Sequence, residues 1–379
     1  MTIDPAARRQ QASDYASARR RLFFADLLIT LLGAWALLGL GLSAAIRAAI
    51  ERQTANQWLV VPLYALVVGG AYALVSLPLS IYGGLILPRR YGLSHQTFGG
   101  WAADQIKGLA IGAPLLLGLL EALYAGLRAF PETWWIWAIG AGALLLIFLL
   151  WLVPAVVSPL FNRFAPLADA ELRERLLALA RRLGAPVKDV LTVDFSRRTT
   201  MANAYVTGIG STHRVVLGDT LVSNYSADEI EAVMAHELSH YVKRDTLRLL
   251  AASIGSLALF FWLASLAVAS GAAWLGLRGP ADVAGLPVFA LVMTILGLAL
   301  QPLMNGYSRR IERAADRYAL DATRRPAAFI SAMRKLRDQN LGEHEPPAWA
   351  VILFSSHPPI SARIRAAEDY ARQHGLPAA

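Results

Sequence analysis

Six long apolar runs constrain the fold of this chain more than any other feature of its sequence. Each is long enough to cross a bilayer, which takes roughly 20 helical residues, and a segment inside lipid satisfies its own backbone groups only as a helix. The alternative is that the six runs are buried core helices of a soluble protein. Only 17% of the residues are charged, whereas soluble domains carry about 25%, which disfavours this alternative. We therefore expect a mainly α, polytopic membrane protein. The runs lie at residues 22–46, 58–87, 105–127, 133–157, 248–277 and 284–306.

The distribution of basic residues predicts how these spans are oriented. Lysine and arginine are in excess on the N-terminal tail, which carries Arg19, Arg20 and Arg21, on the connections after the second and fourth runs, and at the C-terminal end. With six spans these segments share one side, which the positive-inside rule makes cytoplasmic. The first apolar run is too long for a signal peptide, so the tail should be retained. The net charge of +9 then reflects loops that face anionic lipid, not nucleic acid.

The hydrophilic segments predict one small α+β domain on the cytoplasmic side. Its expected elements are an amphipathic helix over 168–183, short strands at 189–194, 203–208 and 214–218, and helices over 304–323, 326–340 and 360–374. The predicted regions are a cytoplasmic tail (1–21), four spans (22–157), a cytoplasmic insert with the sheet (158–245), two further spans (246–306) and a cytoplasmic C-terminal part (307–379).

Two features of the predicted spans leave alternatives open. The run at 58–87 is long, so that it either tilts as one helix or breaks at Pro62 or Pro78. Glu121 lies within the third run. An intramembrane carboxylate is a candidate functional group, but Arg128 lies near the same membrane edge, so that a snorkelling pair is the simpler explanation.

The pattern H-E-x-x-H at residues 236–240 predicts a metal site. His236 and His240 are four residues apart, so that both project from one face of a helix, and Glu237 lies beside them. The chain contains no cysteine, and any metal must be held by His, Asp or Glu. Ser226 and Glu229 form a capping-box pattern that starts this helix. The alternative is a helix with two incidental histidines.

The third ligand must come from elsewhere, because no third histidine follows the motif locally. Glu312 is the best candidate, since it lies in a predicted helix with Asp316 four residues further on the same face. Asp316 is then placed to accept a hydrogen bond from the outer nitrogen of a ligating histidine. The alternative for Glu312 is an ion pair with Arg309 or Arg313.

Several stretches taken in order resemble the CAAX prenyl protease family of membrane zinc metallopeptidases. The resemblance extends from about residue 60 to 370, and the metal helix is its most specific part. The other matching stretches are residues 91–97 (Tyr-Gly-Leu-Ser-His-Gln-Thr), 202–205 (Ala-Asn-Ala-Tyr), 215–221 (Val-Val-Leu-Gly-Asp-Thr-Leu), Glu312 with Asp316, and 356–359 (Ser-His-Pro-Pro) with Arg363.

The resemblance implies a role for each matching residue. His236, His240 and Glu312 would hold one Zn²⁺ per chain, Glu237 would act as general base, and Asp316 would support a ligand. His357 and Arg363 would stabilise the oxyanion, although His357 could also simply precede a helix that starts at the two prolines. The strand residues that would bind substrate are Asn203, Ala204 and Tyr205.

The same resemblance implies a helical chamber built from the spans. Family members from eukaryotes are described with seven spans, whereas six are counted here, so one wall element is missing. The Ala/Leu/Arg-rich composition suggests a bacterial protein, in the inner membrane with its active site on the cytoplasmic side.

These observations favour a membrane-embedded zinc endopeptidase, similar to CAAX prenyl proteases, that acts on membrane-associated peptides or proteins, with or without lipid modification. One alternative is a quality-control metalloprotease of the heat-shock type. A different class is an inactive membrane binding protein or a transporter, which the intact metal set and the lack of paired repeats disfavour.

Overall fold

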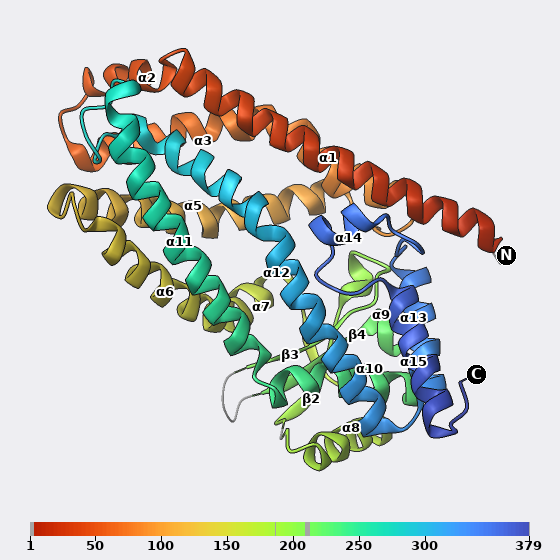
Figure 1. Cartoon of the computed structure of the whole chain (residues 1–379). Helices are drawn as coiled ribbons and strands as arrows, with labels where there is room; N and C mark the ends of the chain where they lie inside the picture. Colours follow the sequence, from red (N-terminus) through yellow and green to blue (C-terminus); the bar gives the residue numbers. More distant parts are fainter. Residues whose placement is uncertain (1–3, 186, 209–212, 379) are drawn as a thin grey trace.

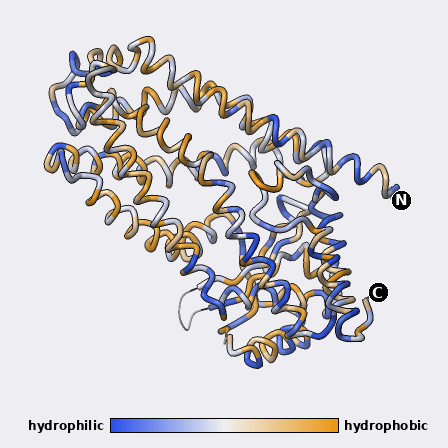
Figure 2. Tube along the Cα trace, viewed as in Figure 1, coloured by the Kyte–Doolittle hydropathy of each residue, from blue (hydrophilic) through white to orange (hydrophobic). Residues whose placement is uncertain are grey.

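A body of long helices carries a small mixed domain at one end (Figure 1). The computed structural model describes residues 4–378 except 186 and 209–212. Apolar residues concentrate along the helical body, whereas polar residues gather in the mixed domain (Figure 2). Six helical segments in the described part are long and apolar enough to cross a membrane, which confirms the predicted class. They are built on α1 (Pro5–Gly39), α3 (Gln57–Ile81), α5 (Phe98–Ala129), α6 (Trp134–Leu152), α11 (Asp245–Trp274) and α12 (Leu286–Thr323).

The first span differs from the prediction at both ends. The expectation of one span over 22–46 is wrong, because α1 ends at Gly39 and a separate helix, α2 (Leu42–Glu51), follows. Gly41 separates them with a φ of 70°, a conformation that glycine adopts without steric cost. The described part of the tail is also helical. Asp4 caps α1, its side chain accepting a hydrogen bond from the amide of Ala6, and α1 continues without interruption into the apolar run.

The second and fourth spans each contain a π-helical turn instead of a break. In the second, η1 (Tyr82–Ile86) joins α3 to α4 (Leu87–Arg90); in the fourth, η2 (Val153–Val157) joins α6 to α7 (Ser158–Phe161). A proline, Pro88 or Pro159, is the second residue after each turn. A proline ring crowds the carbonyl four residues back, and the wider π turn relieves that crowding. The run at 58–87 is therefore one continuous helical segment.

Buried polar contacts close the end of the body that lies far from the mixed domain. Arg47 of α2 pairs with Asp282, just before the 3₁₀ turn η5 (Val283–Gly285) that precedes α12. The hydroxyl of Ser43 lies 2.5 Å from that of Tyr64 on α3. These contacts fix the connection between α11 and α12 against α2 and α3. Elsewhere in the body, Glu121 lies 3.8 Å from Arg128.

The mixed domain contains a four-stranded sheet with the order β1-β2-β4-β3. Its strands are β1 (Phe164–Pro166), β2 (Asp189–Val193), β3 (Ala204–Thr207) and β4 (Arg214–Gly218). The pair β2–β4 is parallel, and the other two pairs are antiparallel. The three predicted strands are present within a residue or two of their expected ends, and β1 was not predicted. Because β3 is last in the order, it forms one edge of the sheet.

Helices from distant parts of the chain enclose this sheet and bury α10 (Ala227–Val242), which carries the H-E-x-x-H motif. The domain core combines residues of α8 with residues of β2, β4, α10, the last turns of α12, α13 and α15. The remaining helices of the domain are α8 (Ala170–Arg182), the 3₁₀ turn η3 (Phe195–Arg197), α9 (Asp219–Val222), α13 (Pro326–Gln339), α14 (Ala348–Phe354) and α15 (Ile360–His374). One helix, α12, therefore runs from the membrane body directly into the core of the mixed domain (Figure 1).

Candidate metal centre

The helix α10 begins at a well-defined cap and presents both motif histidines to the same side. The hydroxyl of Ser226 accepts a hydrogen bond from the amide of Glu229, and the Glu229 carboxylate accepts one from the amide of Ser226. This is the predicted capping box. Lys335 and Ser331 of α13 hold the same carboxylate at 2.7 and 2.6 Å. The start of α10 is therefore fixed, and with it the direction of the side chains three turns later.

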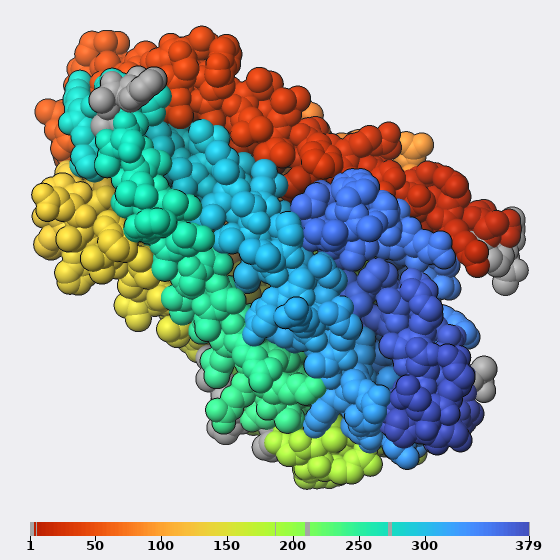
Figure 3. Space-filling model, viewed as in Figure 1, coloured from red at the N-terminus to blue at the C-terminus, as the bar shows by residue number. Residues whose placement is uncertain are grey.

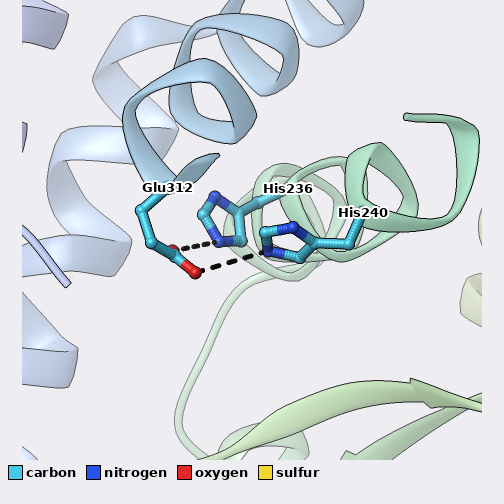
Figure 4. A group of neighbouring side chains, drawn as sticks. All are labelled: His236, His240 and Glu312. Carbon is cyan, nitrogen blue, oxygen red and sulfur yellow. Dashed lines mark ion pairs between the residues drawn. The ribbon is translucent and has the colours of Figure 1, made fainter. Parts of the chain in front are cut away.

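Glu312 of α12 meets the two histidines of α10 (Figure 4). One carboxylate oxygen of Glu312 lies 3.2 Å from Nε2 of His236, and the other lies 3.6 Å from Nε2 of His240. His236 and Glu312 are buried, and His240 is partly buried. Two helices that are separated in the sequence by the span α11 thus bring together the three predicted ligand side chains. One donor atom of each lies within 4.8 Å of the others.

The donor set fits a metal ion of the kind predicted from the sequence. Ligands that surround zinc tetrahedrally at about 2.0–2.1 Å are themselves roughly 3.3 Å apart. Each histidine nitrogen has a different Glu312 oxygen at a similar distance, 3.2 or 3.6 Å, and the three side chains are near enough to reach one ion. The Glu312 oxygen next to His236 is buried and accepts no hydrogen bond from a described residue. A buried carboxylate oxygen without a hydrogen-bond partner is costly, and a bound cation would satisfy it.

The two neighbouring carboxylates also change the pKa of His236. Burial by itself lowers the pKa of His236, but the side chains of Asp316 and Glu312 outweigh it and raise the pKa to about 9. A metal ion takes neutral imidazole as its ligand and releases protons on binding. The groups that stabilise a proton on His236 are thus the groups that would stabilise a cation beside it.

Each candidate ligand histidine has a carboxylate beside its Nδ1 atom. Nδ1 of His236 lies 2.9 Å from Asp316, as the sequence predicted. Nδ1 of His240 lies 3.1 Å from Asp245, which is buried at 2% exposure. Such partners fix the tautomer of the ring and leave Nε2 free for a metal. Sequence reasoning missed Asp245.

The backbone turn before Asp245 explains why its carboxylate reaches His240. Arg244 separates α10 from α11 and adopts a φ of 55°, a conformation that is uncommon for a residue other than glycine. This turn starts α11 at Asp245 and directs its carboxylate back toward the last turn of α10. A carboxylate at the fifth position after the second histidine is the sequence feature that would have found it.

The segment around α15 adds two further predicted residues to the group. Nε2 of His357 lies 3.3 Å from Glu312, although the side chain is 58% exposed. Arg363, on the first turns of α15, is directed differently. Its Nε and Nη2 donate to the two oxygens of Asp316 at 2.9 and 2.5 Å. Arg363 therefore neutralises the carboxylate that holds His236, while His357 faces the open side of the group.

Glu237 lies among charged groups of both signs. Burial raises the pKa of its carboxyl above the ordinary range for glutamate, and the nearby histidines act in the opposite direction. A raised pKa beside candidate ligands is typical of a carboxyl group that exchanges protons with a reactant.

The predicted substrate strand lies at the free edge of the sheet. Ala204 and Tyr205 belong to β3, and Asn203 immediately precedes it. Asn203 is exposed, its side chain accepts a hydrogen bond from the amide of Ala204, and its carbonyl accepts one from Gly218. Ala204 is buried in the core that also contains α10. An edge strand beside the metal helix matches strand addition by an extended peptide.

Arg309 was considered as an ion-pair partner of Glu312, and the structure gives it another role. Its Nη1 donates to the carbonyls of Val351 and Ser355 at 2.8 and 2.7 Å. It thereby ties the end of α14, two residues before His357, to the helix that carries Glu312. The alternative that Arg309 engages Glu312 is wrong.

The contacts of Asp316 lead to a prediction about metal affinity. We expect Asp316→Asn to weaken metal binding by about 10–100-fold, because an amide holds the Nδ1 proton of His236 less well than a carboxylate. The measurement is competition for zinc against a chelating dye. The exposed Asp321→Asn on the same helix should bind as the wild type does. An unchanged affinity in Asp316→Asn would show that the contact with His236 does not support a ligand.

Comparisons with known proteins identify the family of the chain. Residues 166–371 match the model of peptidase family M48, and residues 3–163 match a model described as CAAX prenyl protease N-terminal, five membrane helices. Among the described residues of that second stretch, four helical segments are long and apolar enough to cross a membrane.

Whole-chain relatives extend the likeness. The uncharacterized metalloprotease YhfN of Bacillus subtilis is 31% identical over 94% of this chain and 84% of its own length. A CAAX prenyl protease 1 homolog of rice is 30% identical over 78% of this chain and 70% of its own length. The crystal structure of S. mikatae Ste24p superposes with a TM-score of 0.83 at 25% identity and covers 96% of this chain and 89% of that one.

Proposed function

The chain belongs to peptidase family M48, as a membrane metallopeptidase similar to CAAX prenyl proteases, and on this premise we propose that it is a zinc endopeptidase. Its substrates would be peptides or proteins held at the cytoplasmic surface of the membrane. The observation that carries the proposal is the convergence of His236, His240 and Glu312 at the place where α12 passes from the membrane body into the mixed domain.

Zinc would be held by these three side chains and, when bound, would act as a Lewis acid toward water and the scissile carbonyl. The protein's own residues would move the protons. Glu237 would take a proton from the attacking water and return it to the leaving amine. Its raised pKa supports this exchange, since the carboxylate is then a stronger base toward the water in the first step and holds the proton until the amine leaves.

Other side chains would hold the reactants. The edge strand β3 would pair with the backbone of an extended substrate, with Asn203 at its start. His357 would donate a hydrogen bond to the oxyanion, because its ring is exposed toward the metal group and lies 3.3 Å from Glu312. Arg363, committed to Asp316 by two hydrogen bonds, would keep His236 in place and would act on the oxyanion only through its charge.

The cytoplasmic orientation rests on the basic residues around the mixed domain. The N-terminal part of α1 carries Arg19 and Arg21, which are exposed, and Arg20, which pairs with Glu343 at 2.7 Å. The N-terminal end of α1 is on the same end of the molecule as the mixed domain (Figure 1). By the positive-inside rule that end faces the cytoplasm, which in a bacterium is the inner face of the inner membrane.

A peptide assay with matched lipids tests the substrate class. One peptide sequence would carry S-farnesyl, S-hexadecyl or S-methyl cysteine, and cleavage would be followed in nanodiscs with Glu237→Gln as the background. We expect both long-chain peptides to be cleaved faster than the methyl peptide, because a tethered substrate reaches a higher effective concentration at the membrane surface. Equal rates for all three peptides would contradict membrane tethering and would favour lipid-indifferent quality control.

A further inference from the structure

The helix α14 presents an apolar face that no described residue covers. Trp349 and Ile352 are each 47% exposed, and Ala348 beside them is exposed as well. These three positions lie on one side of the helix, whereas Ala350 on the other side is buried. Contiguous exposed apolar groups on an ordered helix mark a contact surface.

The opposite side of α14 is anchored to α12. Asn305 donates to the carbonyl of Leu353 at 2.7 Å, and Arg309 donates to the carbonyls of Val351 and Ser355 at 2.8 and 2.7 Å. These bonds engage carbonyls at and just beyond the helix end, where intrahelical donors run out, and the carbonyl of Val351 also accepts a hydrogen bond from the amide of Ser355. Because both donors come from one rigid helix, the apolar face of α14 is held in a fixed direction.

Aromatic rings connect Trp349 of this face to a membrane span. The ring centroid of Trp349 lies 6.0 Å from that of Phe354, which lies 5.0 and 6.2 Å from those of Phe23 and Phe24 on α1. Phe24 and Leu28 on α1 are 47% and 56% exposed, in the helix that forms the first candidate span. Figure 3 shows the chain segment of α14 beside α1 on the outer surface of the molecule. The two surfaces therefore face the same surroundings.

Arginines beside α14 indicate the depth in the bilayer at which this apolar surface lies. The guanidinium of Arg20 lies 5.8 Å from the ring centroid of Trp349. Arg19 and Arg21 are exposed just before the exposed Phe24. Arginine beside an exposed tryptophan is typical of the boundary between lipid headgroups and acyl chains. This charge suits anionic headgroups.

We propose that α14 is a lipid-seated interfacial helix, which buries Trp349 and Ile352 in the cytoplasmic leaflet. The occupant of its exposed face is phospholipid. His357 follows Phe354, the last residue of α14, by three positions. The contact of α14 with lipid therefore fixes the distance between the metal group and the bilayer. Both α14 and the membrane spans thus position the metal group relative to the membrane surface.

The absence of cysteine from the chain allows a direct test. Single cysteines would replace Trp349 and Ile352 separately, and Arg372 on the exposed side of α15, whose side chain is 74% exposed, as a control. Each variant would carry an environment-sensitive fluorophore in one-copy nanodiscs of phosphatidylcholine and phosphatidylglycerol. Nitroxide lipids and aqueous iodide would serve as quenchers.

We expect the labels at 349 and 352 to be quenched by nitroxide lipids and protected from iodide, at a depth of about 5–10 Å below the headgroup boundary. The label at 372 should behave in the opposite way. Iodide quenching at both 349 and 352 would overturn the proposal, because the face would then lie in water. Protection from both quenchers would also overturn it, since protein and not lipid would then cover the face. Either site alone decides the question if the other variant fails to fold.

Discussion

Glu237→Gln is expected to keep its zinc and to lose turnover by roughly 10²–10⁴-fold, the usual contribution of a general base. The amide has the shape of the carboxylate but does not accept a proton from water. His236, His240 and Glu312 remain in place, so metal binding should not change. The measurement pairs zinc per chain with kcat on one fluorogenic peptide. A matched control is Glu171→Gln, an exposed glutamate of α8.

Measuring zinc content together with turnover distinguishes the loss of a general base from the loss of a ligand or of folding. A variant that loses both would point to a ligand or a folding defect. A fully active Glu237→Gln protein would exclude Glu237 as the group that takes the proton. The Glu171→Gln variant should match the wild type in both quantities.

Glu312→Ala is expected to lower zinc affinity by more than the roughly 10–100-fold expected for loss of a supporting carboxylate such as Asp316. It removes one of three donors and leaves Nε2 of His236 and of His240 without the carboxylate that lies 3.2 and 3.6 Å away. Turnover should fall with zinc content. The measurement is zinc per chain after dialysis against a weak chelator, with the exposed Asp321→Ala on the same helix as control.

His236→Ala provides a second, independent reading of the ligand set. It should lose metal as Glu312→Ala does, because the two residues contribute donors from different helices to one group. Stoichiometric zinc in either variant would count against that residue as a ligand. If only one of the two retained zinc, the other assignment would stand.

The sequence predicted those parts of the fold and site that depend on local patterns. Apolar runs long enough for a bilayer identified the six spans, and the capping box placed the start of α10. His236 and His240 are four residues apart, and helical periodicity alone predicts that they lie on one face of α10. Glu312 was found because Asp316 follows it at one helical turn, and a pair of carboxylates on one face is a local pattern as well.

The features that were missed depend on contacts between distant segments or on single turns. The break at Gly41 was hidden within an apolar stretch, because apolar periodicity does not report a left-handed residue. Asp245 reaches His240 only through the turn at Arg244. Arg309 contacts α14 across more than forty residues of sequence, and from the sequence its closest acidic neighbour was Glu312. The role of Arg309 depends on packing between distant segments, whereas Gly41 and Asp245 depend on single left-handed residues that apolar periodicity does not report.

The central claim is that a single zinc ion, held by His236, His240 and Glu312, supports peptide cleavage at the membrane surface. The most direct test is the cleavage rate of chelator-stripped protein in nanodiscs as zinc is returned in measured amounts. We expect no cleavage without metal, and a rate that rises with zinc until one ion is bound per chain. Undiminished cleavage by the metal-free protein would contradict it.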